Sequence, residues 1–313
     1  MHHGDVIGID WGTSRLRGYR VDASGRLRAL IASEDGVMRA RGRLAEVLAD
    51  ALRALGAADA LLPVFLSGMV GSAQGWQQVP YLPLQCPLHA LGAHLQRLQT
   101  DAVPGTCHIV PGYLAEHDAA RGQEVDVMRG EEMQLLGAST LDAESCLYLL
   151  PGTHAKWVIL GEGHIRAFRT QMTGELFALL QRHGTLAALM HDSVEAPQAF
   201  AAGVVRAQRD SLGNALFSCR ALVVSGRMPG SHARDYLSGV LIGAEWRDAM
   251  ARDLDRSRVV GIIADAALAQ RYATAATQLG VRVRVHDPDA IYVAALHALR
   301  QQCDAAASGR TLA

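Results

Sequence analysis

The chain has 313 residues, of which half are hydrophobic, and its 30 basic and 31 acidic side chains leave a net charge of −1. This length predicts two domains rather than one, and the balanced charge argues against a nucleic-acid or an anionic-membrane surface. The five cysteines are widely spaced without a CxxC pair, so we expect no disulfide framework and a reducing, cytoplasmic environment. We also expect no signal peptide and no transmembrane helix, because no apolar run reaches the roughly 18 residues that cross a bilayer.

The first half of the chain predicts an α/β domain that opens on three strands and a glycine turn. Apolar residues at 6–9 lead into Asp10-Trp11-Gly12-Thr13, and a polar–apolar alternation over 15–21 indicates a half-buried second strand. Turn residues at 22–25 separate it from a return strand. The elements expected in this half are strands at 6–9, 15–21, 26–31 and 63–66, a strand and turn at 108–112, and helices at 44–55 and from 130 to about 138.

The second half repeats this opening. The apolar run at 147–150 leads into Pro151-Gly152-Thr153-His154, and a strand, a glycine turn and a return strand follow. Gly12-Thr13 and Gly152-Thr153 lie 140 residues apart, which predicts two similar domains joined by a firm hinge. The elements expected here are strands at 147–150, 156–160, 165–170, 221–224, 259–264 and 281–285, helices from 174 and at 236–250, 268–279 and 289–303, and a loose tail from 304 to 313.

The two glycine turns are suited to binding the phosphates of a nucleotide. Glycine lets the backbone approach a phosphate closely, and its free N–H groups point at the anion. Two such turns facing each other across a cleft would clamp a nucleotide, although each alone also fits an ordinary tight turn. Asp10 could hold Mg²⁺ through water, and Arg17 and Lys156 could neutralise charge on a transferred phosphoryl group. The Walker pattern GxxxxGK[ST] is absent from the sequence.

Phosphoryl transfer to an alcohol also needs a carboxylate near the attacking hydroxyl. Glu131 and Glu132 are candidates, and since consecutive helical residues point about 100° apart, only one of them can face a given site. The alternative is two solvated acids at the positive end of a helix dipole. His154 could bind a phosphate or cap its own turn. The cations that could hold an anionic substrate are Arg15, Arg129, Arg169 and Lys156, although most arginines in such a chain lie on solvated faces.

The segment from Asp10 to Arg17 resembles the first phosphate motif of the actin-like ATPase superfamily, which includes sugar kinases and Hsp70-type ATPases. In the sugar kinases the motif is Asp-x-Gly-Thr-[Ser/Thr] followed by an arginine, and Arg17 fills that place. The whole chain is similar to the 2-dehydro-3-deoxygalactonokinase family. The segments that carry this similarity are 67–72 with Gly75-Trp76, 80–82, 128–132 with Gln134, 151–154 with Lys156-Trp157, 168–170 with 172–176, and 237–239 with 241–245.

The resemblance implies a fold of two actin-like (ribonuclease H-like) α/β ATPase domains with an interdomain cleft. We expect the domains at 4–138 and 139–313, with the helix from Asp289 packing back on the hinge. The implied reaction is the ATP- and Mg²⁺-dependent phosphorylation of the 6-hydroxyl of 2-dehydro-3-deoxy-D-galactonate, a step of galactonate catabolism. The expected partners are this sugar acid and ATP, and a homodimer is compatible with the sequence.

The resemblance, together with the flanking cations, also suggests roles for individual residues. Asp10 is expected to hold the metal, and Glu131 or Glu132 to supply the catalytic carboxylate. The residues expected to bind the phosphates of ATP are Gly12, Thr13, Ser14, Arg17, Gly152, Thr153, His154 and Lys156. The residues expected to bind the sugar acid are Arg15, Gly68, Met69, Val70, Trp76, Arg129 and Arg169.

One departure from the superfamily pattern concerns the adenine region. Members usually have a glycine after the strand that meets adenine, whereas Asp265 follows the strand here, with Leu268 close behind it. An aspartate there could clash with adenine, or contact its amino group or the ribose. The sequence also leaves open the gluconate epimer as substrate, a phosphohydrolase of the same fold, and a nucleotide-dependent assembly or chaperone ATPase.

Overall fold

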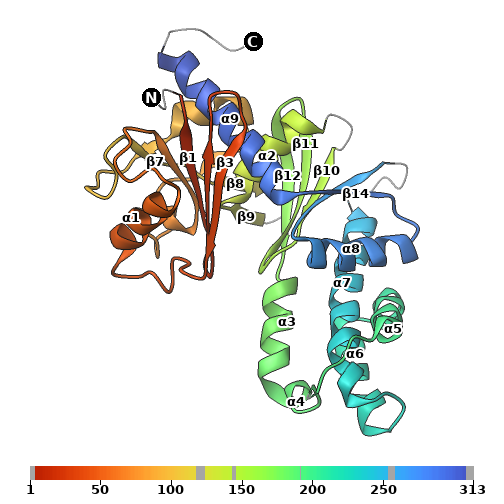
Figure 1. Cartoon of the computed structure of the whole chain (residues 1–313). Helices are drawn as coiled ribbons and strands as arrows, with labels where there is room; N and C mark the ends of the chain where they lie inside the picture. The colour runs from red at the N-terminus through yellow and green to blue at the C-terminus, as the bar shows by residue number, and fades with distance from the viewer. Residues whose placement is uncertain (1–3, 118–123, 143–145, 191, 253–257, 308–313) are drawn as a thin grey trace. The chain divides into compact units, whose positions relative to one another are not determined.

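The computed structural model describes residues 4–117, 124–142, 146–190, 192–252 and 258–307, and the chain divides into two compact units (Figure 1). The first unit contains Met1–Ala143, Leu160–Phe168 and Pro288–Ala313, and the second contains Glu144–Ile159 and Arg169–Asp287. The C-terminal helix therefore belongs with the N-terminal residues. The division into domains at 4–138 and 139–313 stays a prediction.

A six-stranded sheet organises the first unit, in the order β3-β2-β1-β4-β7-β6. β1 is antiparallel to β2, with Asp10 opposite Arg17, and parallel to β4, with Asp10 opposite Ser67. The first four predicted strands are confirmed to within two residues at each end. The bounds are β1 Val6–Trp11, β2 Leu16–Val21, β3 Leu27–Ser33, β4 Val64–Gly68, β6 Gln96–Arg97 and β7 Cys107–Ile109.

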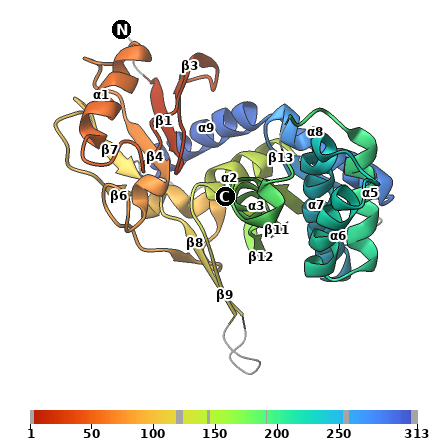
Figure 2. The same ribbon diagram turned by 90° about the horizontal axis from the view of Figure 1, so that it is seen from below.

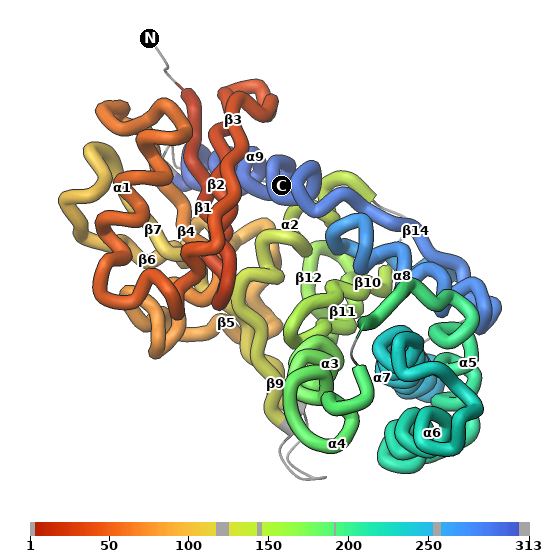
Figure 3. Tube along the Cα trace, turned by 60° about the horizontal axis from the view of Figure 1, so that its bottom comes forward, coloured from red at the N-terminus to blue at the C-terminus, as the bar shows by residue number. Residues whose placement is uncertain are grey.

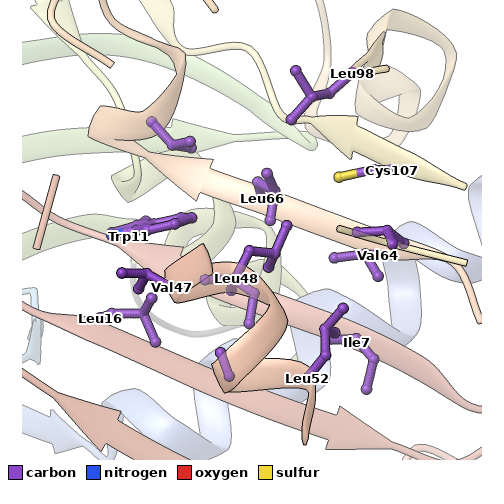
Figure 4. Packing of buried hydrophobic residues seen from close by; sticks show 14 of the residues in the cluster. Ile7, Trp11, Leu16, Val47, Leu48, Leu52, Val64, Leu66, Leu98 and Cys107 are labelled. Atoms are coloured by element: carbon purple, nitrogen blue, oxygen red, sulfur yellow. The ribbon is translucent and has the colours of Figure 1, made fainter. Parts of the chain in front are cut away.

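One face of this sheet is a hydrophobic core covered by α1 (Leu44–Ala54), as Figure 4 shows. Ile7 and Ile9 point to this face from β1, and Leu66 lies beside Ile9 on β4. Side chains alternate between the two faces of a strand, so Gly8 and Asp10, which follow these isoleucines in turn, belong to the other face. The buried residues of α1 are Val47, Leu48, Ala51 and Leu52.

The opposite face of the sheet is covered by α9 (Pro288–Ala307) and carries Asp10. Gly8 makes this close approach possible, because a Cβ atom there would lie 2.8 Å from Leu296 Cδ2 and 2.9 Å from Tyr292 Cε1. Gly8, four residues before Gly12, is thus a packing site for the C-terminal helix.

α9 also packs against α2 (Glu131–Leu141). Gly137 of α2 meets the backbone carbonyl of Ile291, and a side chain at residue 137 would overlap it. The expectation of a loose tail from residue 304 is wrong for 304–307, because these residues continue α9. Residues 308–313 of the predicted tail lie outside the described residues.

A three-stranded sheet, in the order β5-β8-β9, leads into α2. β8 and β9 are antiparallel and lie side by side in Figure 2. Sequence analysis did not predict this sheet, although Glu124-Val125-Asp126-Val127 alternates polar and apolar residues as a strand does. The bounds are β5 Leu82–Pro83, β8 Tyr113–His117 and β9 Glu124–Met128, and the short 3-10 helices of the first unit are Met69–Gly71 and Leu88–His94.

The second sheet has the order β12-β11-β10-β13-β14. β10 is antiparallel to β11 and parallel to β13, which repeats the relation of β1 to β2 and β4. The pairing of the strands therefore confirms the predicted repeat of one strand–turn–strand arrangement in the two halves of the chain. The bounds are β10 Leu147–Leu150, β11 Ala155–Gly161, β12 His164–Gln171, β13 Val260–Ile263 and β14 Val283–His286.

A group of helices completes the second unit, and α5, α6 and α7 lie side by side in it (Figure 3). Gly203 of α5 and Gly239 of α7 bring these two helices into backbone contact. The bounds are α3 Thr173–Arg182, α4 Gly184–Ala187, α5 Pro197–Arg209, α6 Leu212–Val224, a 3-10 turn Gly230–His232, α7 Ala233–Arg252 and α8 Ala266–Gln278.

The strand predicted at 221–224 is wrong, since these residues form the last turn of α6. Four apolar residues in a row do not distinguish a strand from a buried helix segment by their period. The buried residues Ala215, Ser218 and Cys219 show the spacing of three and four that marks a helix. Among the helices of the described residues, none is long and apolar enough to cross a membrane.

Candidate active site

The first glycine turn joins β1 to β2 and is fixed by backbone hydrogen bonds. The Gly12 N–H donates to the Arg15 carbonyl at 2.9 Å, and the Val37 N–H donates to the Gly12 carbonyl at 3.0 Å. Thr13 and Ser14 are exposed, so their hydroxyls and backbone N–H groups lie at the surface of the first unit. The structure therefore keeps the predicted residues together in one constrained turn.

Asp10 stands at the end of β1, beside this turn, and is half-buried. Burial raises the pKa of its carboxyl to about 6, with Arg17 lowering it and Glu131 and Asp289 raising it. Within the described parts of the chain, no hydrogen bond to the Asp10 carboxylate is formed. Three acidic groups and one arginine thus interact electrostatically here. A bound cation would reduce the repulsion among the three carboxylates.

The first turn of α9 contributes a group that sequence analysis did not assign to the site. Tyr19 donates its hydroxyl hydrogen to Asp289 Oδ1 at 2.7 Å, and Arg17 Nη1 lies 3.7 Å from the same oxygen. Tyr292, one turn further along, stacks on Tyr19 with ring centroids 4.5 Å apart. Its hydroxyl shares a 2.8 Å hydrogen bond with Ser67, the neighbour of Asp10 on β4. No local sequence pattern predicts these contacts, because the partners are more than 200 residues apart in the chain.

Glu131 and Glu132 both cap the start of α2 but have different environments. Glu131 Oε2 accepts from the Arg129 N–H at 2.9 Å, and Glu132 Oε2 accepts from the Gly130 N–H at 2.7 Å. Glu131 is half-buried and its charge acts on Asp10, whereas Glu132 is 0% exposed. Burial, followed by the charge of Glu131, raises the pKa of Glu132 to about 8. The alternative of two solvated acids is therefore wrong for Glu132.

Gly68 adopts a φ of 87° and its Cα lies close to Gly130, so the loop after β4 lies against the start of α2. A Cβ atom at residue 130 would be 3.2 Å from the Gly68 Cα. Met69 and Val70 follow in a 3-10 turn, and Trp76 packs edge-on against Trp11 at 6.4 Å between ring centroids.

Two predicted arginines of the first unit have different settings. Arg129 donates from Nη2 to the Val79 carbonyl at 2.6 Å, and its guanidinium lies 4.3 Å from the centre of the Tyr81 ring. Arg15 forms a 3.2 Å ion pair with Glu34 in which both side chains are two-thirds exposed. The Arg129 side chain is thus fixed by contacts within the first unit, whereas Arg15 lies on a solvated surface.

The second glycine turn lies between β10 and β11 in the second unit. Gly152, Thr153 and His154 are exposed, and the Thr153 carbonyl accepts from the Glu175 N–H at 2.9 Å. His154 Nε2 lies 2.5 Å from Glu175 Oε2, so the imidazole is engaged by a carboxylate at the start of α3. Gly174 lies directly against the Gly152 carbonyl, where a side chain would not fit.

The other two cations of this region lie on the strands that follow the turn. Lys156 is 5% exposed on β11, and its ammonium donates to Thr170 Oγ1 at 2.6 Å. Arg169 is half-buried on β12, next to Thr170. Both are therefore part of the sheet rather than of the turn itself.

A pocket of about 690 Å³ lies within the second unit and contains Gly152 and Gly174 in its lining. Asp265 and Leu268, the predicted adenine-region residues, line the same pocket. Asp265 is the N-cap of α8 and its Oδ1 accepts from the Leu268 N–H at 3.0 Å. The remaining lining residues come mainly from α7 and α8 and include Ser238, Leu241, Arg271 and Tyr272.

Comparisons with known proteins agree with one another. The model of a family described as 2-keto-3-deoxy-galactonokinase matches residues 10–299. The 2-dehydro-3-deoxygalactonokinase of Escherichia coli strain K12 is 35% identical over 302 residues, which cover 94% of this chain and 96% of that protein. A crystal structure assigned as a 2-dehydro-3-deoxygalactonokinase from Sinorhizobium meliloti superposes with a TM-score of 0.84 at 33% identity, covering 98% of each chain.

A more distant solved structure bears on the fold alone. The activator of the 2-hydroxyisocaproyl-CoA dehydratase from Clostridium difficile, solved with bound ADPNP, has a TM-score of 0.54 at 11% identity and covers 99% of each chain. The actin-like ATPase fold predicted from the sequence is thereby confirmed.

Proposed function

This chain belongs to the 2-keto-3-deoxy-galactonokinase family, and on that basis we propose that it transfers the γ-phosphoryl group of ATP to the 6-hydroxyl of 2-dehydro-3-deoxy-D-galactonate. The observation that carries the proposal is the family match over residues 10–299, which contains both phosphate turns. Membership of a kinase family implies the use of ATP. The reaction is a step of galactonate catabolism and takes place in the cytoplasm.

Glu131 is the proposed general base. Its half-buried carboxylate is anchored through one oxygen to the start of α2 and interacts with Asp10 at the phosphate turn. It accepts the proton of the 6-hydroxyl as the oxygen forms a bond to the γ-phosphorus and the bond from that phosphorus to the leaving ADP oxygen breaks. Glu132 is unsuited to this role, because it is fully buried and its raised pKa keeps it protonated at neutral pH.

The two glycine turns are proposed to bind the phosphates of ATP through backbone N–H groups and hydroxyls. The first supplies Gly12, Thr13 and Ser14, with Arg17 beside them, and the second supplies Gly152, Thr153 and His154. Lys156 acts through its positive charge from within the sheet, since its ammonium is already bonded to Thr170.

Asp10 fits a Mg²⁺ ion held through water. Its carboxylate is half-buried among acidic groups, and the hydrogen bonds of the described residues leave both of its oxygens available. Mg²⁺ retains several waters and needs only one or two carboxylates in kinase sites, and Asp10 supplies one. When bound, the ion would supply positive charge to the phosphate oxygens.

The pocket of the second unit is the proposed adenosine site. Leu268 offers an apolar surface for the base, and the Asp265 side chain is directed to the start of α8 by its hydrogen bond to the Leu268 N–H. This cap gives a structural reason for an aspartate at this position and engages one of its carboxylate oxygens.

The sugar acid is proposed to bind in the first unit. Gly68, Met69 and Val70 lie next to the start of α2, so a hydroxyl bound there would lie close to Glu131. Trp76 and Arg129 lie on the same unit, and Arg15 acts there as an outlying positive charge on the solvated surface.

The experiment that tests this proposal is product analysis. The purified protein is incubated with Mg-ATP and, in parallel, 2-dehydro-3-deoxygalactonate or its gluconate epimer, and the product is examined by phosphorus and proton NMR. We expect a 6-phosphate ester from the galactonate compound, formed faster than from the epimer. ATP hydrolysis without any ester would instead assign the chain to a phosphohydrolase activity, and faster reaction of the epimer would reverse the substrate assignment.

A further inference from the structure

Glu245 is an acidic residue of α7 that is only 3% exposed, and both of its carboxylate oxygens accept hydrogen bonds. Oε1 accepts from Trp157 Nε1 at 2.8 Å. Oε2 accepts from the Tyr272 hydroxyl at 2.7 Å and from the Thr173 hydroxyl. All three donors are buried as well, and they belong to β11, α8 and α3. One carboxylate therefore joins four elements of the second unit.

A buried carboxylate is a costly means of joining elements, because its removal from water is unfavourable. Burial raises the pKa of Glu245, and the three hydrogen bonds oppose this rise. The three donors are neutral side chains, so these contacts contain no ion pair. Apolar side chains of similar volume often stabilise a fold as well as a buried charge does. A carboxylate differs from them in fixing where its donors lie, which indicates a role in positioning.

Thr173 connects Glu245 to the second glycine turn. It is the first residue of α3, and Gly174, the next residue, packs directly against the backbone of that turn. The Glu175 N–H then donates to the Thr153 carbonyl at 2.9 Å. The hydrogen bond from Thr173 to Glu245 thus fixes the helix start against which the turn packs.

Tyr272 connects Glu245 to the helix that carries the adenine-region residues. It lies on α8 one turn after Leu268, and both residues line the pocket of about 690 Å³. Thr173 lines the same pocket from α3, whereas Glu245 is not part of the lining. Any effect of Glu245 on a ligand in this pocket is therefore transmitted through the residues that it holds.

We propose that Glu245 is a positioning residue for nucleotide binding, which fixes the second glycine turn through Thr173 and α8 through Tyr272. The inference rests on the proposed function, because it takes this pocket as the adenosine site and this turn as a phosphate site. It assigns Glu245 no contact with ATP. The Thr173 hydrogen bond should matter for the phosphates, and the Tyr272 hydrogen bond for the adenosine end.

The test compares two nucleotides in calorimetric titrations of the full-length protein with Mg²⁺. One is a non-hydrolysable imido analogue of ATP, and the other is AMP, which lacks the β- and γ-phosphates. Thr173→Val and Tyr272→Phe each remove one hydroxyl, and Glu245→Gln leaves a single acceptor oxygen for three donors. Tyr236→Phe is the matched control, because Tyr236 is also 3% exposed on α7 and its hydroxyl bonds Ser218 on α6.

We expect Thr173→Val to raise the dissociation constant of the ATP analogue about tenfold and to leave that of AMP unchanged. Tyr272→Phe should raise both constants by a similar factor. Glu245→Gln should raise that of the analogue about 10- to 100-fold, and adding Thr173→Val to it should change little, because the two residues act through one hydrogen bond. Tyr236→Phe should lower the thermal unfolding midpoint and leave both constants unchanged.

Wild-type affinities in Glu245→Gln, or fully additive effects of Glu245→Gln and Thr173→Val, would overturn the inference. Should Glu245→Gln fail to fold, the single-hydroxyl variants decide, since equal losses for both nucleotides in Thr173→Val would overturn it as well. A wild-type protein that binds both nucleotides but does not phosphorylate the sugar acid would overturn the proposed function alone. A wild-type protein that binds neither nucleotide would overturn both.

Discussion

Replacement of Glu132 by Gln should change the way in which stability depends on pH. The carboxyl is 0% exposed, and its folded pKa of about 8 lies well above the ordinary value of 4.5. A folded pKa above the unfolded one means that the folded protein binds the proton more tightly. The stabilising effect of this proton is complete below pH 4.5 and is lost as the pH rises to about 8.

The size of this change in stability follows from the shift in the pKa of Glu132. One pKa unit corresponds to about 1.4 kcal/mol, so the wild type should lose about 4 kcal/mol of unfolding free energy from this group between about pH 5 and about pH 8. The glutamine variant has no proton to lose and should gain stability relative to the wild type by that amount over the same range. Arg129, Glu131, Tyr113 and Tyr292 surround the group electrostatically and are present in both proteins.

Urea unfolding of the two proteins at several pH values measures this difference. Glu46→Gln is the matched control, because Glu46 is an exposed acid in the first turn of α1. Its stability difference from the wild type should stay constant over the same pH range, because this substitution removes no buried carboxyl. A constant difference for Glu132→Gln as well would show that the buried carboxyl is ionised in the folded protein and would refute the reasoning.

Three further substitutions test other parts of the account. Glu131→Gln should lower kcat by about 10²- to 10⁴-fold in a steady-state assay, and an unchanged kcat would remove it as the base. Asp10→Asn should lose about 10- to 100-fold of activity with an unchanged circular dichroism spectrum, and wild-type magnesium dependence of that variant would contradict its proposed role. Gly137→Ala should destabilise the first unit by about 1–3 kcal/mol in thermal unfolding, because the new methyl group meets the Ile291 carbonyl; an unchanged midpoint would contradict the close packing of α2 on α9.

The strands and the two glycine turns are predictable because their signals are local. Ile7 and Ile9 alternate with the residues of the other face, and Gly152-Thr153 repeats the setting of Gly12-Thr13. The same period that marks a half-buried strand also fixes which side chains share a face. The prediction failed at 221–224, where an apolar run without a clear period belongs to a helix.

The environment of the candidate site depends on contacts that no local pattern encodes. Asp289 reaches Tyr19 from the far end of the chain, and sequence analysis predicted only that a helix begins there. Glu131 and Glu132 looked equivalent as neighbours in a first helical turn, and only the packing around them buries one and leaves the other half-exposed.

The central claim is that this chain is a kinase of a 2-keto-3-deoxy sugar acid, and the most direct test is the acceptor dependence of ADP formation. Initial rates are measured by coupled assay with Mg-ATP alone and with added 2-dehydro-3-deoxy-D-galactonate. The account predicts that ADP forms at an appreciable rate only when the sugar acid is present, with one phosphate ester made for each ADP released. ADP release at the same rate without the acid, or none with it, would contradict the account.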